Sequence, residues 1–296
     1  MKEVHQWSID GRTKARHRKG VLGDLYIEVT ATSTAHGKWV GTTFLEVKVV
    51  EQGPGVGVMW SDTLRARLRP WSGDPGCAFL LITAADSVGP DHHDLQQWLA
   101  TAHQWGYDRV RTSAVPPTMA APLIDVGFTS VQQLVVLSAA HHEAPKFHIP
   151  RDVSPRTFRV ARRRQPTHKM SDVLRIDEAS FPSPWNMSWE DMSDALRATT
   201  QSRLFVSENK NRIDGFVLVG ASNNTGFIQR LAVEPSARRT GVASRLVAKS
   251  LEWSYKRGCS TTVVNTEATN SSALGLYESL GFRALPDGLS VLEYTL

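Results

Sequence analysis

Residues 231–247, LAVEPSARRTGVASRLV, constrain the fold of this chain more than any other stretch of it. A strand-like apolar run ends in a Glu-Pro pair, and a turn rich in arginine and small residues precedes a helix-like pattern. Such a helix start directs unpaired N–H groups and a positive dipole end at one spot, which suits a pyrophosphate. The residues predicted to form this anion site are Arg238, Arg239, Thr240, Gly241, Val242, Ala243 and Ser244.

The segments around this turn predict a mixed α/β (α+β) architecture for residues 157–296. In chain order we expect a strand, two helices and three strands, then the turn, followed by helix, strand, helix and strand. Asparagine-rich turns separate the three consecutive strands, which therefore form an antiparallel meander. Ser188 is the predicted N-cap of the second helix, and Gly258 and Gly281 end the last two helices.

A second motif, NSSALGLYESLGF at residues 270–282, adds a resemblance to a known family. Together with the turn and the strand order, its spacing resembles the GCN5-related N-acetyltransferase (GNAT) superfamily. The resemblance implies that the cofactor is acetyl-CoA and that the turn binds its pyrophosphate. It also implies that Tyr277 lies near the cofactor sulfur and that further cofactor contacts come from Leu231, Ala232, Val233, Asn270 and Ala273, the first three beside a splayed pair of strands.

The catalytic residues suggested for this site are Tyr277 and Glu267. Acyl transfer needs a neutral amine, donors for a developing oxyanion and a proton for the departing thiolate, and a phenol can supply that proton. The strand position that carries a carboxylate base in many family members holds Ile228, Gln229 or Arg230 here. Glu267 is the remaining carboxylate candidate, with Asn265 beside it.

The loop Phe181-Pro182-Ser183-Pro184-Trp185 concerns the acceptor. It is similar to a signature of ribosomal-protein N-terminal-alanine acetyltransferases, and this resemblance implies that Phe181, Pro184 and Trp185 border the acceptor groove. An α-amine has an ordinary pKa of about 8, against about 10.4 for lysine, so its deprotonation costs roughly 3 kcal/mol less. A site with a weak base therefore favours an N-terminal amine. The alternative interpretation of the loop is a purely structural one, a rigid proline turn with a buried tryptophan.

The first half of the chain repeats part of this pattern. Residues 75–139 are expected to run strand, helix, strand, helix, strand, and Gly127-Phe128 aligns with Gly281-Phe282. This alignment places Pro116 and Leu123 where the second half has Asn270 and Tyr277. We therefore expect two GNAT-like domains, each a mixed and mostly antiparallel sheet flanked by helices. Their boundaries are a degenerate domain at 1–140, a linker at 141–156 and a catalytic domain at 157–296, with an unrelated α+β domain as the alternative for the first.

Composition limits what else the chain can be. With 296 residues, 41% of them hydrophobic, it can hold two ordinary globular cores. No apolar run is long enough for a membrane span and no signal-peptide pattern is present, so we expect a cytoplasmic protein with no membrane partner. Cys77 and Cys259 are predicted to be buried thiols, and His141, His142 and His148 lack ligand spacing, so no metal is predicted.

Positive charge is concentrated in the second half, where residues 151–296 hold 20 Lys and Arg against 15 Asp and Glu. The clusters Arg12–Lys19 and Arg159–Arg164 could contact RNA, the ribosome or an acidic protein. Neither cluster has interleaved aromatic residues, which favours a solvated surface instead.

Three functions are consistent with these patterns. The leading hypothesis is acetyl-CoA-dependent transfer of an acetyl group to a primary amine by direct attack, with a protein N-terminal α-amine as the favoured acceptor. One alternative is a small-molecule amine acetyltransferase of the tandem, mycothiol-synthase kind. The other is a non-catalytic module that docks on RNA or the ribosome.

Overall fold

A computed structural model describes residues 6–9, 13–19, 25–31, 55–60, 64–71, 73–84, 89–141, 156–158, 168–210 and 212–296. The basic cluster Arg159–Arg164 and nearly all of the predicted linker lie outside these residues. Strands β1 (Gln6–Ile9), β2 (Thr13–Lys19) and β3 (Leu25–Ala31) form a small antiparallel sheet, and β2 carries most of the other basic cluster.

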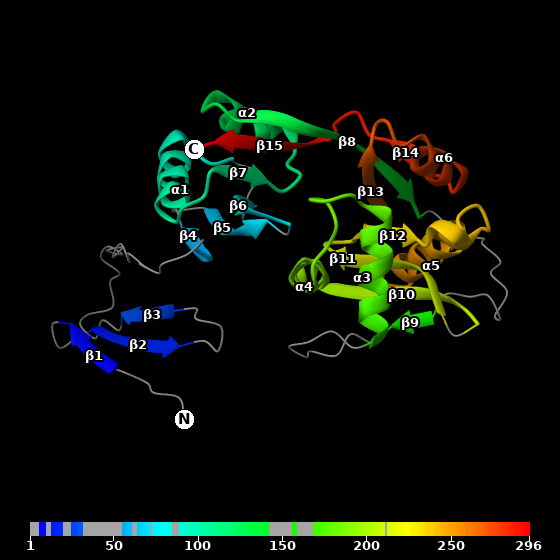
Figure 1. Cartoon of the computed structure of the whole chain (residues 1–296), viewed down its shortest axis with the longest axis horizontal. Helices are drawn as coiled ribbons and strands as arrows, with labels where there is room; N and C mark the ends of the chain where they lie inside the picture. The colour runs from blue at the N-terminus through cyan, green and yellow to red at the C-terminus, as the bar shows by residue number, and fades with distance from the viewer. Residues whose placement is uncertain are drawn as a thin grey trace.

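A 12-stranded mixed sheet organises the rest of the described chain, in the order β4-β5-β6-β7-β15-β8-β13-β12-β11-β10-β9, with β14 paired to β8 (Figure 1). Its strands in the first half are β4 (Gly57–Trp60), β5 (Leu64–Trp71), β6 (Asp74–Ala84), β7 (Arg109–Thr112) and β8 (Thr129–Ala140). Those in the second half are β9 (Arg156–Phe158), β10 (Gln201–Asn209), β11 (Arg212–Ser222), β12 (Thr225–Val233), β13 (Thr261–Glu267), β14 (Arg283–Ala284) and β15 (Leu289–Thr295).

The helices confirm the predicted α/β class. They are α1 (His92–Gln104), α2 (Pro117–Asp125), α3 (His168–Ser180), α4 (Trp189–Arg197), the short 3₁₀ helix η1 (Pro235–Ala237), α5 (Val242–Lys256) and α6 (Ser271–Ser279). The predicted antiparallel meander is β10-β11-β12. Ser188 caps α4 as expected, in a capping box with Asp191, and Gly258 and Gly281 follow α5 and α6 with φ of 78° and 87°.

The two halves exchange a strand within the sheet. β8 belongs to the first half but pairs along the whole of β13, whereas β15 belongs to the second half but pairs with β7. In Figure 1, β8 runs from the region of α2 to the side of β13. Each exchanged strand also contributes to the core of the other half. Leu137 of β8 is buried in the second half's core, and Leu292 of β15 is buried in the first half's core.

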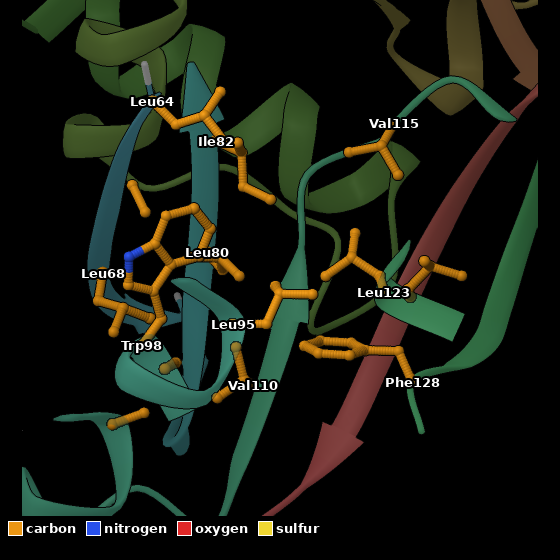
Figure 2. Close-up of a cluster of buried hydrophobic side chains, with 14 of the residues drawn as sticks. Leu64, Leu68, Leu80, Ile82, Leu95, Trp98, Val110, Val115, Leu123 and Phe128 are labelled. Atoms are coloured by element: carbon orange, nitrogen blue, oxygen red, sulfur yellow. The ribbon is translucent and has the colours of Figure 1, made fainter. Parts of the chain in front are cut away.

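Three buried clusters fix the helices on the sheet. In the first half, the inward residues of β5 and β6 pack against α1 and α2, and Figure 2 shows Leu123 near Phe128 in this core. In the second half, α3 and α4 cover one face of β10–β12, here called the α3 face. The other face, the α5 face, carries α5 and α6.

Both cysteines are buried and unpaired, as predicted. Burial raises the pKa of the Cys77 thiol to about 11, which leaves it protonated and unreactive at neutral pH. None of the helices in the described part of the chain is long and apolar enough to cross a membrane.

Candidate active site

Strands β12 and β13 separate halfway along their length. Their parallel pairing ends at Ile228 and Val264, and beyond this point β13 continues beside β8 alone in the described chain. The separation coincides with a β-bulge, because Arg230 and Ile228 face consecutive residues of β11 and leave Gln229 as the extra residue. The predicted splayed pair of strands is therefore present, with Leu231–Val233 along one side of the gap.

Backbone groups of β12 are directed into this gap. The N–H of Glu234 donates to Asp214 O at 2.9 Å, so Glu234 and Ala232 turn their polar groups toward β11. Alternation in an antiparallel pair then directs the N–H and C=O of Leu231 and Val233 the other way, toward the gap. Val233 O accepts hydrogen bonds from Arg238 Nε at 3.3 Å and Ser180 Oγ at 3.4 Å. Of the three predicted backbone contacts, Leu231 and Val233 have the suitable orientation.

The predicted anion turn leads from β12 into α5. Arg239 has a left-handed φ of 64° and Gly241 one of 82°, and Thr240 Oγ1 donates to Ala237 O at 2.7 Å. A non-glycine residue in this region costs of order 1 kcal/mol, a strain typical of ligand-binding turns. Gly241 provides no side-chain cap, so the first N–H groups of α5 stay open.

The side chains of this turn divide between the surface and the core. Arg238, Arg239 and Thr240 are exposed, whereas Val242 is 2% exposed and anchors the helix start in the α5-face core. A Cβ on Gly241 would lie 3.0 Å from Arg245 Nη1, which is close enough to require a shift. The turn therefore combines fixed positive charge with an accessible backbone, as an acyl-CoA pyrophosphate requires.

The second predicted motif lies on the same face. Tyr277 is 5% exposed in the cluster that also contains Val242, and Leu231, Val233 and Ala273 pack against that cluster. Burial raises the pKa of the Tyr277 phenol, so the group keeps its proton. Asn270 caps α6, because its Oδ1 accepts from Ala273 N at 3.1 Å.

The carboxylate candidate Glu267 lies on the opposite face of β13. Val264 is buried against α5, so strand alternation places Asn265 and Glu267 on the α3 face. Both are exposed although β13 is an inner strand, and Glu267 Oε1 accepts a hydrogen bond from Gln132 Nε2 at 2.5 Å. Tyr277 thus lies on the α5 face of the sheet and Glu267 on the α3 face. The gap between β12 and β13 lies between these two proposed catalytic residues.

An ion pair that sequence reasoning missed holds the predicted acceptor loop. Asp177 is completely buried, and its carboxylate accepts from Arg230 Nε at 2.6 Å and Nη2 at 2.8 Å. Arg230 Nη2 also donates to Trp185 O at 2.8 Å, and its guanidinium lies 3.4 Å from the centre of the Phe181 ring. Arg230 is therefore a structural cation, and Asp177 fixes the loop to the bulged strand.

The two neighbouring residues of β12, Ile228 and Gln229, have different surroundings. Ile228 is buried in the α5-face core, and Gln229 Oε1 is buried with no hydrogen-bond partner among the described residues. A buried unpaired amide oxygen costs free energy, and a donor on a ligand in the gap would satisfy it. The bulge, the open N–H groups of β12 and the turn before α5 together fit acetyl-CoA.

Residues of the first half that the sequence patterns did not indicate also reach this loop. Trp71 Nε1 donates to Pro184 O at 2.6 Å, while Arg67 and Arg69 pair with acidic residues of α4. The strict alternation of LRARLRPW in β5 is the signal that could have indicated an outward arginine row, although it does not identify the partner.

Comparison with known proteins agrees with this geometry. Residues 170–282 match the acetyltransferase (GNAT) family. N-alpha-acetyltransferase 30 of Homo sapiens is 46% identical over 57 residues, which are 19% of this chain and 16% of that protein. The Saccharomyces cerevisiae protein of the same name is 40% identical over 57 residues, 19% of this chain and 32% of that protein. The chain thus matches less than a third of either relative.

Solved structures share the fold over a larger part of the chain. A tandem GNAT protein from the clavulanic acid biosynthesis pathway aligns with a TM-score of 0.57 and 13% identity, covering 82% of this chain and 84% of that one. A GCN5-related N-acetyltransferase from Sphaerobacter thermophilus aligns with a TM-score of 0.51 and 17% identity, covering 79% and 76%. The splayed strands and the turn before α5 agree with the matched segment, so the second half of this chain is similar to the GNAT family over residues 170–282.

Proposed function

We propose that this chain transfers the acetyl group of acetyl-CoA to the α-amine of a protein N-terminus. The observation that carries the proposal is the gap beside Leu231 and Val233, which is flanked by the anion turn and by Tyr277 on one face and by the loop of Phe181–Trp185 on the other. Similarity to N-alpha-acetyltransferase 30 supports an N-terminal acceptor.

The donor side of the mechanism follows from the α5 face. When bound, acetyl-CoA supplies a thioester carbon for attack by an amine. Arg238, Arg239 and the open N–H groups of Thr240 to Ser244 would hold its pyrophosphate, and Asn270 and Ala273 lie at the start of α6 on the same face. The N–H groups of Leu231 and Val233 are oriented to stabilise negative charge that develops on an oxygen in the gap.

Proton transfer is assigned to two side chains. Tyr277 keeps its phenolic proton because burial raises its pKa, so it can donate to a departing thiolate. Glu267 is exposed on the α3 face and accepts a hydrogen bond from Gln132, which makes it the proposed base for the incoming amine. An α-amine has an ordinary pKa of about 8 and needs little help to lose its proton near neutral pH.

Calorimetric titration of acetyl-CoA tests the donor site. Arg238→Glu should weaken binding about tenfold or more, because it replaces a phosphate-facing charge with a repulsive one. Arg257→Glu at the far end of α5 makes the same change in net charge and should leave binding unchanged. Failure of the wild type to bind acetyl-CoA would overturn the proposal.

Thiol release in the presence of acceptors then tests the second substrate. We expect turnover with peptides that have a free N-terminus, including the N-terminal alanine that the loop's resemblance suggests, and little turnover with N-terminally blocked lysine peptides. The fold likeness to a tandem GNAT protein favours small amines as the competing acceptor class. Turnover of small amines alone would support that alternative, and salt-dependent RNA binding without turnover would support the docking module.

A further inference from the structure

Arginines of the first half hold the helix that follows the acceptor loop. Arg67 Nη1 lies 3.1 Å from Asp194 Oδ2, and Arg69 Nε lies 3.6 Å from the same atom. Arg69 also pairs with Asp191, the residue that forms the capping box with Ser188 at the start of α4. The first turn of α4 is thus fixed both by its own cap and by β5 of the first half.

The loop itself is held by Trp71, the last residue of β5. Its indole Nε1 donates to Pro184 O at 2.6 Å, and its ring meets the ring of Trp185 edge to face, with centroids 5.3 Å apart. Arg111 of β7 places its guanidinium 4.9 Å from the Trp71 ring centre and 5.4 Å from that of Trp185. Glu293 of β15 accepts from Arg111 Nε at 2.7 Å and so fixes the arginine.

Two consecutive carbonyl groups of the loop are therefore held from the two halves of the molecule. The carbonyl of Pro184 accepts from Trp71 in the first half, and that of Trp185 accepts from Arg230 in the second. Arg230 lies next to the bulge residue on β12, so the second contact also ties the loop to the strand gap. A loop held by adjacent carbonyls cannot shift at one contact without straining the other.

We propose that Trp71 and Arg111 are positioning residues through which the first half sets the acceptor specificity of the second. The inference rests on the proposed function, because it concerns the loop that borders the acceptor. It assigns the first half a role toward the peptide N-terminus and none toward acetyl-CoA, whose proposed contacts lie on the α5 face. The substrate class is an unblocked peptide N-terminus whose first residues lie against the Phe181–Trp185 loop.

Steady-state kinetics of Trp71→Phe test the proposal in the full chain. This variant keeps an aromatic ring but removes the hydrogen bond to Pro184 O, and we expect a five- to tenfold rise in KM for the acceptor peptide. The KM for acetyl-CoA should change little, and the melting temperature should fall by a few degrees, as expected for the loss of one hydrogen bond. Arg111→Lys keeps a charge for Glu293 but loses the planar stack on the tryptophans, so we expect a smaller effect in the same direction.

Trp98→Phe is the matched control. Trp98 is 2% exposed in the first half's core, and its Nε1 has no hydrogen-bond partner there, so this variant changes packing alone. We expect it to lower the melting temperature without changing either KM. The ratio of kcat/KM between two acceptor peptides should likewise change in Trp71→Phe and stay constant in Trp98→Phe, because lost stability does not alter selectivity.

Hydrogen exchange supplies a readout that does not need turnover. The N–H of Trp185 donates to Pro182 O at 2.8 Å and that of Met187 to Asp177 Oδ2 at 2.7 Å. These amides should exchange faster in Trp71→Phe and remain unchanged in Trp98→Phe. Absence of acetyl transfer by the wild type would reject the proposed function. Normal transfer with an unchanged acceptor KM and unchanged loop exchange in Trp71→Phe would reject the positioning role alone.

Discussion

The two halves of the sheet share their turns but differ at the positions that could perform chemistry. Helices α1 and α5 both end at a left-handed glycine, Gly106 with φ 81° and Gly258 with φ 78°. Helices α2 and α6 do the same at Gly127 and Gly281, and the next N–H returns to the last helical turn in each case. These positions need a φ that L side chains rarely adopt.

The corresponding positions on α2 and α6 have different side chains. Pro116 begins α2 without a side-chain cap, whereas Asn270 caps α6. Leu123 is completely buried where the second half has Tyr277, so an apolar isobutyl side chain replaces a phenol. Residues needed for the fold occur in both halves, whereas those proposed for acetyl transfer occur in the second half alone. Specificity and catalysis can therefore be separated between the two halves.

The largest expected difference concerns the two buried tyrosines. Tyr277→Phe should lower kcat by about 100-fold or more, because it removes the proposed proton donor. Tyr107→Phe in the first half removes a hydrogen bond to Gly55 O of 2.8 Å and should cost about 1 kcal/mol of stability with kcat unchanged. Stopped-flow or coupled assays with saturating substrates check this. Equal kcat values for the two variants would mean that the halves do not differ in this way.

The pH dependence of the wild type adds a second criterion. Since burial raises the pKa of Tyr277, its proton is present throughout the neutral and mildly alkaline range. The value of kcat/KM should therefore rise as the acceptor amine deprotonates near pH 8 and stay level up to about pH 10. A fall between pH 8 and 9 would indicate that a different group donates the proton.

Strand exchange predicts that the halves unfold together. Phe128→Ala and Phe282→Ala each empty a fully packed core position and should each cost about 3–5 kcal/mol. Because β8 and β15 each complete the other half's core, both variants should lower the midpoint of one common transition. Calorimetry that shows two separate transitions, each moved by one variant only, would contradict this expectation.

Two glycines with the same backbone conformation separate binding from folding. Gly241→Ala and Gly106→Ala each place a methyl group at a positive φ, with an expected cost of about 1 kcal/mol in stability. Only Gly241→Ala should also raise the KM for acetyl-CoA, because its Cβ would crowd Arg245 beside the anion turn. A similar change of KM in Gly106→Ala would show that the effect comes from lost stability.

The smallest effect concerns the end of β8. His141 follows this strand, and its Nε2 lies 2.8 Å from Thr262 Oγ1 of β13. Burial lowers the pKa of His141, so the unfolded chain binds more protons than the folded one below about pH 6.5. This histidine should therefore reduce stability as the pH falls below 6.5. The free energies of unfolding of the wild type and His141→Gln, measured by urea titration, should converge in that range. A constant difference between the two would contradict the contact of His141 with β13.

Local signals explain what could be predicted from the sequence. Gly258, Gly281 and the Ser188 capping box act within a few residues, so they mark helix ends without knowledge of the fold. The anion turn before α5 is equally local. The two-residue strand β14 is too short to have a pattern, and it was not predicted.

Long-range pairing explains what could not. β8 and β15 both contain apolar residues, and no local rule decides which of them lies beside β13. Asp177 and Arg230 are separated by 53 residues, and Trp71 and Pro184 by 113. The partner of an outward arginine or tryptophan depends on how the sheet twists and closes, which periodicity does not encode. The base assignment to Glu267 and the domain limits at 140 and 157 remain predictions.

The pairing of β15 with β7 also determines when the first half can complete its fold during synthesis. Arg111 precedes its partner Glu293 by 182 residues, which a ribosome needs about 10 to 40 seconds to add. During that interval the first half lacks Leu292 and keeps the edge of β7 open to other strands. We therefore expect the nascent chain to need protection by a chaperone until its last strand has left the ribosome.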